Sequence, residues 1–412
     1  MQAQVTPLDG AKAIGITFTD KPVTAFGGLA LFVAFAERIG LGPKLAEVLP
    51  FVLTSPNATP PHHIVLAFLA GVLAGARRFA QLAVLQADVP IRQLFGLRRF
   101  PSTATVTRFF RRFTPKAITA TFEPLWMWCL DRLPTRSTGY TLDLDSSVFE
   151  RYGTQEGALK GYNPRKRGRP SHHPLFAVLA EARCIAHVWL RSGNTASARG
   201  ATAFLAEVLA LLAGRVQVTL VRADSGFFDE AILVALEAAL LPYALAARFT
   251  SLLQAGVTGL AFRPFAPGLE VAELAFQARR WTRARRIVVV REELATRPAA
   301  RGRTLLQVPG YRFHAVVTSL TLAPEAVWRT YNGRADSENR IKELKHAFGA
   351  DGFCSRRFSG TEAALRFICL LYNLVGEFQR SLGQTTFLAY LQRLLPRAPN
   401  CNAVPVRGSR MR

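Results

Sequence analysis

The spacing of hydrophobic and polar positions changes near residue 135. Before that point, apolar residues recur every three or four positions, which is the period of helices that bury one side. The predicted helices are 26–39, 43–48 and 62–85, and several prolines separate the last two. After residue 135, alternating segments and short apolar runs predict strands. The pattern therefore predicts an α/β protein in which an all-helical N-terminal region precedes a sheet.

The elements predicted beyond residue 135 follow a defined order. Three strands are followed by a helix, a strand, a helix and a strand, at 139–149, 175–183, 185–191, 198–213, 216–222, 229–239 and 242–249. A ribonuclease-H-like core has this order, and in that fold the first and fourth strands are neighbours. We therefore expect a ribonuclease-H-like sheet, with a later helix packed across it.

Composition adds a partner to this fold. The chain has 52 Lys and Arg residues against 28 Asp and Glu residues, a net charge of +24. Such an excess of positive charge points to a polyanion, and DNA is the first candidate. A membrane is not expected as partner, because the longest apolar run, 64–76, is too short to span a bilayer. The five cysteines are scattered, and no secretion signal precedes the fold, so we expect a cytoplasmic protein.

An insertion is expected between Asp224 and Glu338, because this interval is longer than the remaining core elements require. Residues 250–312 are basic and strand-like, which predicts a β-rich insertion. A further apolar helix, 361–379, is expected to support the core. The expected domains are a helical DNA-binding domain (1–135), the core in two parts (136–249 and 313–385), the insertion (250–312) and a basic tail (386–412), which is expected to be disordered from residue 397 on.

Four polar residues lie at helical spacing in the second part of the core. Tyr331, Arg334, Glu338 and Lys345 fall within an arc of roughly 60° on what is predicted to be one helix. A carboxylate beside two cations and a phenol suits a divalent metal next to a phosphodiester, whose oxygens the cations and the phenol hold. The alternative is a solvated helix face on which Arg334 and Glu338 form an ion pair.

Two further carboxylates lie on predicted strands. Asp143 and Asp145 share one face of the first strand, and Asp224 stands at the end of the fourth strand, just before Gly226. Carboxylate oxygens are the ligands that Mg²⁺ and Mn²⁺ prefer, and one carboxylate can bridge two ions. A strand-borne Asp, a strand-end Asp and a helix-borne Glu together predict a two-metal phosphoryl-transfer site.

These motifs resemble those of DDE transposases from bacterial insertion sequences, in the group with a Tyr-x-x-Arg-x-x-x-Glu-x-x-x-x-x-x-Lys signature. Within that group the sequence is most similar to the thirteen-eighty family of insertion sequences. The resemblance covers roughly residues 20 to 385, and its motifs are 142–147, 161–164, 169–174, 190–195, 222–228 and 331–345. One departure is Ser337, where the wider group often carries Ile or Val.

The resemblance implies roles for individual residues. Asp145, Asp224 and Glu338 would be the catalytic carboxylates and would hold two Mg²⁺ or Mn²⁺ ions. Asp145 is preferred because its Asp-Ser-Ser context matches the family, and Asp143 remains the rival. The resemblance also implies cut-and-paste transposition through a DNA hairpin, by a homodimer bound to terminal inverted repeats and to target DNA. Such a protein would work in the bacterial cytoplasm, at the nucleoid.

Basic residues outside the signature are candidates for DNA contact. They lie on a helix expected to begin at Ser102, in a loop at 160–173 expected to pair with no strand, and around Trp281 in the insertion, where related transposases reach over the active site. The candidates, beside Tyr331, Arg334 and Lys345, are Arg108, Arg111, Arg112, Arg165, Lys166, Arg167, Arg169, His172, His173, Arg280, Trp281 and Arg283.

Each group of basic residues has an alternative role. The helix is otherwise an amphipathic helix with a basic outer face and buried Phe109 and Phe113, and the insertion segment a hairpin with a solvated edge. His172 and His173 contact phosphate or pack the loop, and a zinc site is disfavoured because no second pair of ligands lies nearby. For the whole chain, the alternatives are a structure-specific nuclease on the same core and a DNA-binding regulator with a decayed catalytic domain.

Overall fold

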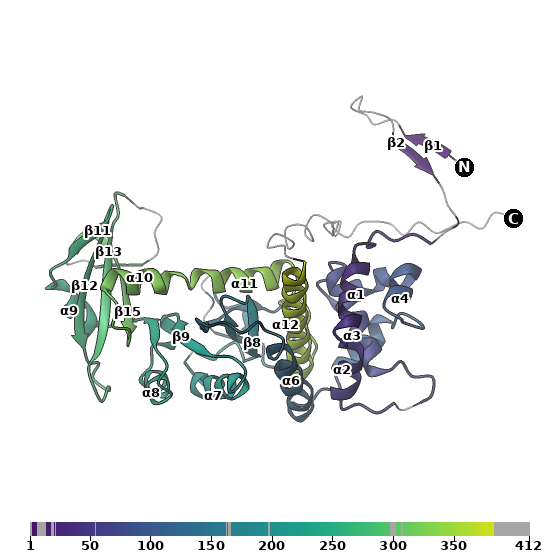
Figure 1. The fold of residues 1–412 in the computed structure, drawn as a ribbon, viewed down its shortest axis with the longest axis horizontal. Coiled ribbons are helices and arrows are strands. Elements are labelled where there is room, and N and C mark those ends of the chain that lie inside the picture. The colour runs from purple at the N-terminus through teal and green to yellow at the C-terminus, as the bar shows by residue number, and fades with distance from the viewer. Residues whose placement is uncertain are drawn as a thin grey trace.

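The computed structural model describes residues 2–5, 14–17, 20, 22–53, 55–161, 163, 166–196, 198–296, 302–305 and 308–382. Arg165 and the expected tail at 386–412 lie outside these residues. The described chain is elongated, with the N-terminal helices at one end, a central sheet, and the strands of the insertion at the other end (Figure 1). No helix within the described residues is long and apolar enough to cross a membrane.

The central sheet is mixed. Its core strands are β3 (Tyr140–Ser146), β7 (Leu175–Leu179), β8 (Cys184–Trp189), β9 (Val218–Ala223) and β10 (Tyr243–Ala246), and its connecting helices are α7 (Ala201–Leu212) and α8 (Glu230–Ala238). The spatial order is β8-β7-β3-β9-β10. Strands β3, β7 and β8 are antiparallel neighbours, whereas β3, β9 and β10 run parallel. The elements follow one another in the order predicted from the sequence, and β3 lies beside β9 as expected.

The strands of the insertion extend this same sheet. They are β11 (Arg263–Ala266), β12 (Leu269–Phe276), β13 (Arg285–Glu293), β14 (Arg303–Leu305) and β15 (Val308–Thr318), preceded by a helix that was not predicted, α9 (Ser251–Thr258). Strand β15 pairs with β13 on one side and with β10 on the other. The boundary expected at residue 312 therefore falls inside one continuous strand, because a single ladder joins the insertion to the core.

The N-terminal region is mainly helical. Its elements are α1 (Leu29–Arg38), α2 (Leu41–Val48), α3 (Pro61–Leu73), the 3₁₀ helix η1 (Phe79–Ala87), α4 (Val89–Leu94), α5 (Thr103–Phe110) and α6 (Pro115–Leu130). The prediction of one helix at 62–85 is wrong, because α3 ends in a turn in which the Ala76 N–H donates to the Gly71 carbonyl. The prediction of an all-helical region is also wrong, since β1 (Gln2–Val5) pairs with β2 (Ile14–Thr17), a segment rich in β-branched residues.

Helix α12 (Phe358–Ser381) joins the N-terminal helices to the sheet. On one side Phe367 lies 4.6 Å from Phe122 of α6, measured between ring centroids, and Phe378 lies 5.3 Å from Phe35 of α1. On the other side, the Asn373 amide bonds to both backbone groups of Ile185 in β8, at 2.7 and 2.8 Å. The prediction of a core-supporting helix at 361–379 is confirmed. Because α12 contacts α1 and α6 on one side and β8 on the other, it holds the N-terminal helices beside the central sheet.

Helices α10 (Pro324–Asn332) and α11 (Ala335–His346) follow each other across the top of the sheet (Figure 1). The prediction of one continuous helix is wrong, because the chain leaves α10 at Gly333 and Arg334. A Cβ on Gly333 would overlap the Arg222 guanidinium, which reaches this junction from β9. The two helices remain close to one line, so the residues of the signature still lie above the sheet.

A small second sheet lies beside this helix row. It consists of β4 (Phe149–Glu150), β5 (Leu159–Lys160) and β6 (Pro170–His172), in the order β4-β6-β5. The expectation that segment 160–173 pairs with no strand is therefore wrong at both of its ends. Strand pairing leaves the stretch between β5 and β6 as the loop.

Candidate active site

The three predicted carboxylates come together at the carboxyl ends of two neighbouring strands. Strands β3 and β9 are parallel with Leu144 opposite Ala223, so the residues that follow, Asp145 and Asp224, lie side by side. Glu338, in the first turn of α11, completes the group from above. All three line one cavity of about 1240 Å³. The adjacency of the strands, which the order of elements predicted, is what brings the two aspartates together.

Burial and the neighbouring carboxylates raise the pKa values of the two aspartates. Burial and the charge of Asp224 raise the pKa of Asp145 to about 7, against the lowering effect of Arg334. Burial, with Glu338 contributing, likewise raises the pKa of Asp224. Clustered buried carboxylates are unfavourable unless positive charge is brought among them. The site therefore has the electrostatic character of a cation-binding site.

In this structure Arg334 supplies the positive charge. Its Nη1 lies 3.4 Å from Asp145 Oδ2 and its Nη2 lies 2.8 Å from Glu338 Oε1. Burial lowers the pKa of Arg334, but Tyr331 and the carboxylates raise it more, and the net shift is upward. Among the described residues no group of three acidic, His or Cys side chains is arranged to hold a metal ion, and the Arg334 guanidinium bridges two of the three carboxylates. The donor set itself, three carboxylates, fits Mg²⁺ or Mn²⁺.

Asp143, the rival of Asp145, has a different environment. Its side chain is fully buried, and its two oxygens accept hydrogen bonds from Arg222 Nε and Nη2 at 2.7 and 2.8 Å. The Arg222 Nη1 donates to the Thr330 carbonyl at 2.9 Å, in the last turn of α10. Both carboxylate oxygens of Asp143 are thus taken by one guanidinium. This geometry favours Asp145 as the carboxylate that faces the cavity.

The last signature residue, Lys345, also lines the cavity. Its Nζ donates to the Val148 carbonyl at 2.9 Å and lies 5.1 Å from the centre of the Phe149 ring. Lys342 lines the same cavity and was missed from the sequence. Its signal was present, because Lys342 follows Glu338 by one helical turn and falls on the same side of the helix.

The basic loop is divided between exposed and buried side chains. Lys166, Arg167 and Arg169 are exposed, and Lys166 pairs with Glu150 at 3.0 Å while it lines the cavity. Arg169 lies 4.7 Å from the centre of the Tyr152 ring. These side chains are accessible to a polyanion, whereas nothing is described for Arg165.

The prediction that His172 and His173 contact phosphate is wrong, because both side chains are buried. The Nδ1 atom of His172 accepts from Arg151 Nε at 2.9 Å, and its Nε2 donates to the Glu156 carbonyl at 2.9 Å. Burial and the nearby Arg151 lower the pKa of His172 to about 4, so the ring is neutral. The alternative role, packing of the loop, is the one the structure supports.

In the insertion, the prediction that Trp281 stacks a base is wrong. The indole is buried, with its ring centroid 5.2 Å from that of Phe228 and 5.7 Å from that of Phe276. Arg280 is exposed, and Arg283 is exposed but pairs with Glu237 at 2.6 Å. Phe276 belongs to the neighbouring strand β12, whereas Glu237 of α8 and Phe228, just before α8, hold this segment against the core.

Helix α5 has the predicted form. The Ser102 hydroxyl accepts from the Thr105 N–H at 3.1 Å, which confirms the N-cap, and Phe109 and Phe113 are buried as expected. Three arginines, Arg108, Arg111 and Arg112, are exposed. The helix and the residues after it therefore present a basic outer face. This face is expected both for a helix that contacts DNA and for an ordinary amphipathic helix exposed to solvent.

A pH-dependent stability of the metal-free protein follows from the Asp145 pKa. The folded-state pKa of about 7 lies above the ordinary value of 3.8, so the folded state binds more protons between these values. The free energy of unfolding should therefore fall as the pH rises from about 4 to about 7. In EDTA, Asp145→Asn should have a higher Tm than wild type at pH 8, and little difference should remain at pH 4. Mn²⁺ should stabilise wild type at pH 8 more than at pH 5, because its ligands must lose their protons.

The exposed Asp336→Asn variant is the matched control, since it removes an acidic side chain of α11 that is 68% exposed. Identical pH profiles for wild type and Asp145→Asn in EDTA would show that Asp145 does not titrate as described.

Comparison with known proteins identifies the family. Residues 6–393 match the protein family described as "Transposase DDE domain group 1". No curated protein sequence matches the chain significantly. Among solved structures, the chain is similar to piggyBac transposase in a structure titled as its synaptic complex with hairpin DNA. The TM-score is 0.50 at 11% identity, over 91% of this chain and 80% of the other, and this likeness concerns the fold. The match spans nearly the whole sequence, so the chain belongs to the DDE transposase family and is an enzyme that cleaves DNA and transfers its strands.

Proposed function

We propose that the protein carries out cut-and-paste transposition of a bacterial insertion sequence of the thirteen-eighty family. The observation that carries the proposal is the meeting of Asp145, Asp224 and Glu338 at the carboxyl ends of β3 and β9 under α11. We assign the strand order β8-β7-β3-β9-β10 to a ribonuclease-H-like core, with the insertion at 250–312 and a DNA-binding region at 1–135. Work at the bacterial nucleoid is part of the same proposal.

In this proposal the three carboxylates hold two Mg²⁺ or Mn²⁺ ions, which when bound activate the attacking oxygen and stabilise the leaving oxygen. Arg334 now pairs with Asp145 and Glu338, and it would turn from them to a phosphate oxygen of the DNA. Lys345 would hold a second phosphate oxygen, beside the loop that contains Val148. Tyr331, whose ring lies 5.8 Å from the Arg334 guanidinium, would support that side chain.

The DNA partners are proposed to be the terminal inverted repeats of the element and its target. The exposed arginines Arg108 on α5 and Arg111 and Arg112 just after it suit contact with the duplex. A hairpin on the transposon end and a homodimer on DNA complete the proposal. Support for the hairpin comes from the similar fold of piggyBac transposase, whose structure is titled as a synaptic complex with hairpin DNA.

Cleavage of the element's own ends tests this function. DNA that carries the ends, taken from the sequence that flanks the gene, should be cut by the protein in Mg²⁺ and left intact in EDTA. A hairpin-capped product on denaturing gels is expected, because it would form between cleavage and joining. Scrambled ends of the same length are the control. Cutting of both DNAs alike would favour a structure-specific nuclease, and binding without any cleavage would favour a decayed regulator.

A further inference from the structure

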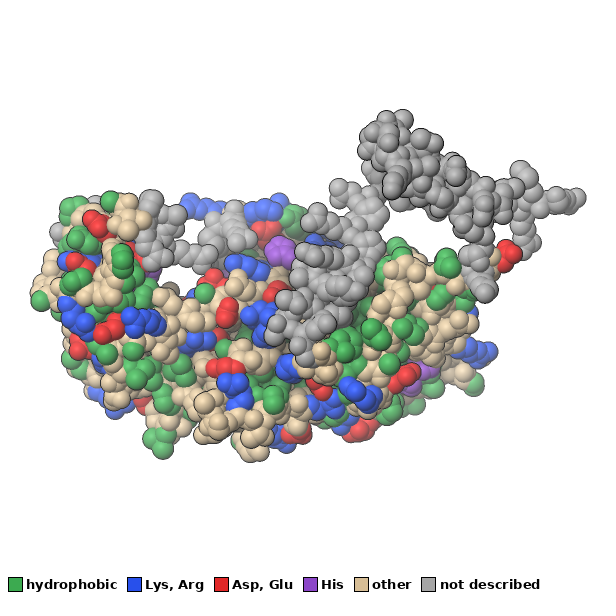
Figure 2. Space-filling model, turned by 45° about the horizontal axis from the view of Figure 1, so that its top comes forward, with side chains coloured by type: hydrophobic (Ala, Val, Ile, Leu, Met, Phe, Trp, Pro, Cys, Tyr) green, Lys and Arg blue, Asp and Glu red, His purple; other side chains and the backbone are tan. Residues whose placement is uncertain are grey.

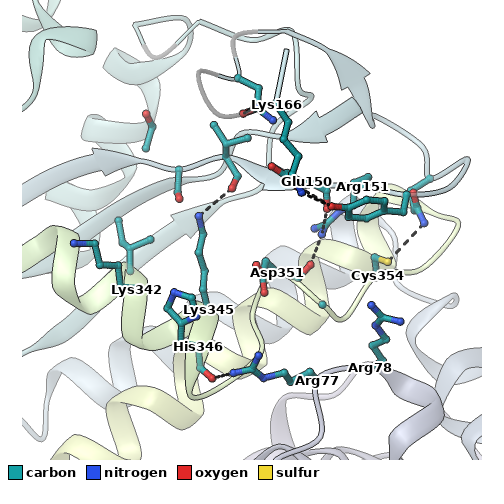
Figure 3. A pocket seen from close by; sticks show the side chains of 18 of the residues that line it. Arg77, Arg78, Glu150, Arg151, Lys166, Lys342, Lys345, His346, Asp351 and Cys354 are labelled. Carbon is teal, nitrogen blue, oxygen red and sulfur yellow. Dashed lines mark hydrogen bonds and ion pairs between the residues drawn. The ribbon is translucent and has the colours of Figure 1, made fainter. Parts of the chain in front are cut away.

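The cavity that holds the carboxylates extends to the N-terminal helices. Beyond Glu338 its wall follows α11 through Lys342 and Lys345 to His346, and it then reaches Arg77 and Arg78, just before η1. Figure 3 shows the three α11 side chains on one side of the cavity, with Arg77 and Arg78 at the neighbouring corner. Neither arginine belongs to the DNA-contacting residues expected from the sequence. The cavity thus connects two regions that lie far apart in the chain.

Hydrogen bonds and close packing hold Arg77 against the end of α11 and against Gln81 of η1. The Arg77 Nη2 donates to the His346 carbonyl at the end of α11, and its backbone N–H donates to Gln81 Oε1 at 2.6 Å. The chain after α11 packs directly on Arg77, since a Cβ on Gly349 would come within 2.8 Å of the Arg77 Cα. Arg78, the next residue, is exposed and is held at a fixed place relative to α11 by these contacts.

The charges of the cavity are separated along its length. Three carboxylates lie at one end, whereas the remaining charged side chains are mostly cationic: Arg77, Arg78, Arg151, Lys166, Lys342 and Lys345, against Glu150 and Asp351. Glu150 is already paired with Lys166 at 3.0 Å. Among the described residues, Arg78 and Lys342 pair with no carboxylate and are exposed. This end of the cavity therefore attracts anions.

The length of the cavity sets the size of its ligand. From Glu338 to His346, the axis of α11 rises about 12 Å, at 1.5 Å for each residue. One DNA strand advances about 3.4 Å for each nucleotide along the duplex axis, so this wall corresponds to about three or four nucleotides. Lys342 lies near the middle of that distance, one turn from Glu338.

We propose that Lys342 and Arg78 form a phosphate track that guides one strand of the transposon end from the carboxylates to the N-terminal helices. This inference rests on the proposed function and adds the path of the DNA. Lys342 contacts the phosphate one or two nucleotides from the scissile one, and Arg78 contacts the phosphate three or four nucleotides away. The track would place the bound end in register with α5, whose Thr107 lines the same cavity.

Phosphate neutralisation in the DNA tests the track. In end DNA, a single methylphosphonate is placed at each of the five positions on either side of the scissile phosphate, and binding is measured for wild type and Arg78→Ala. At the third or fourth position on one side, the neutral linkage should weaken binding by wild type roughly five-fold and leave Arg78→Ala unaffected. Binding by Lys342→Ala should instead be unaffected by a neutral linkage at the first or second position, where the same linkage weakens binding by wild type. Each variant should reduce the slope of log affinity against log salt by about 0.9.

Arg38→Ala is the matched control, because Arg38 is an exposed arginine of α1 outside the cavity. Equal sensitivity of wild type and Arg78→Ala at every position overturns the track. If wild type cleaves specific ends while Arg78→Ala binds them with an unchanged salt slope, the track is wrong and the proposed function stands. If wild type recognises no ends at all, the proposed function fails with it.

A second measurement does not depend on affinity. Cys354 lines the cavity and is the one half-buried cysteine within the described residues, whereas Cys129, Cys184 and Cys369 are buried. In a Cys401→Ser background, end DNA with a disulfide-activated tether at the third or fourth nucleotide should cross-link to Cys354. The same DNA should not cross-link to Cys354→Ser. A tethered strand that never reaches Cys354 would mean that the DNA takes another path.

Discussion

Glu338→Gln should lower the rate of end cleavage at least about a thousand-fold, which corresponds to about 4 kcal/mol of transition-state stabilisation. The amide keeps the size of the side chain but loses the charge that a divalent ion requires. The fold should be unaffected, because the Glu338 side chain is 27% exposed on the outer part of the site. The amide oxygen still accepts from Arg334, which lies 2.8 Å from Glu338 Oε1 in the native protein. Single-turnover cleavage of end DNA at saturating protein measures the loss.

Asp336→Asn is the control for this variant, since it removes an exposed carboxylate from the same helical turn. Its cleavage rate should match that of wild type. End DNA should still bind to Glu338→Gln, because the carboxylate itself repels phosphates. Cleavage that persists in Glu338→Gln would remove this residue from the catalytic group.

The position of the three candidate carboxylates could be predicted because it depends on local patterns. Alternation along β3 places Asp145 on a defined face, and the end of β9 places Asp224 at a sheet edge. Parallel pairing of the two strands then brings the aspartates together in register. The helical spacing of the signature placed Glu338 above the same edge even though α10 and α11 are separate helices. The geometry of such regular strands and helices can be predicted from the spacing of their residues in the sequence.

Exposure and long-range packing could not be predicted in this way. Trp281 and His172 occur among arginines, which is the composition of a DNA-contacting segment, yet Phe228, Phe276 and Arg151 cover them. Phe228 and Arg151 come from other segments of the chain, so the sequence around Trp281 and His172 does not show that these side chains are buried. The Arg77 corner has the same origin, because Arg77 and His346 are in contact although they lie 269 positions apart in the chain.

The break between α10 and α11 shows how one residue connects the site. Arg222 lies two positions before Asp224 on β9 and bonds to Asp143, which lies two positions before Asp145 on β3. The same guanidinium bonds to Thr330 in α10, at the junction that leads to Glu338. One side chain thus joins β3 and β9, which lead to the two aspartates, to the last turn of α10, which leads into α11 and Glu338. We therefore expect Arg222 to act as a positioning residue.

Arg222→Met should destabilise the protein by about 3–5 kcal/mol and abolish cleavage, because it leaves the buried Asp143 without its partner. Arg222→Lys keeps the charge but not the planar fork, so it should restore much of the stability. Its cleavage should remain slow and should require more Mg²⁺ for half-maximal rate, since the link to Thr330 is lost. Urea unfolding and the Mg²⁺ dependence of single-turnover cleavage measure the two effects separately.

The double variant Arg222→Met with Asp143→Leu separates positioning from stability. Replacing both members of a buried ion pair by apolar residues is often neutral for folding, so its free energy of unfolding should return close to that of wild type. Its cleavage should stay impaired, because no side chain then holds the α10–α11 junction to β9. Arg183→Met is the matched control, since the Arg183–Glu343 pair at 3.0 Å is partly exposed and contributes about 1 kcal/mol or less. A double variant that regains both stability and cleavage would reduce Arg222 to a structural ion pair.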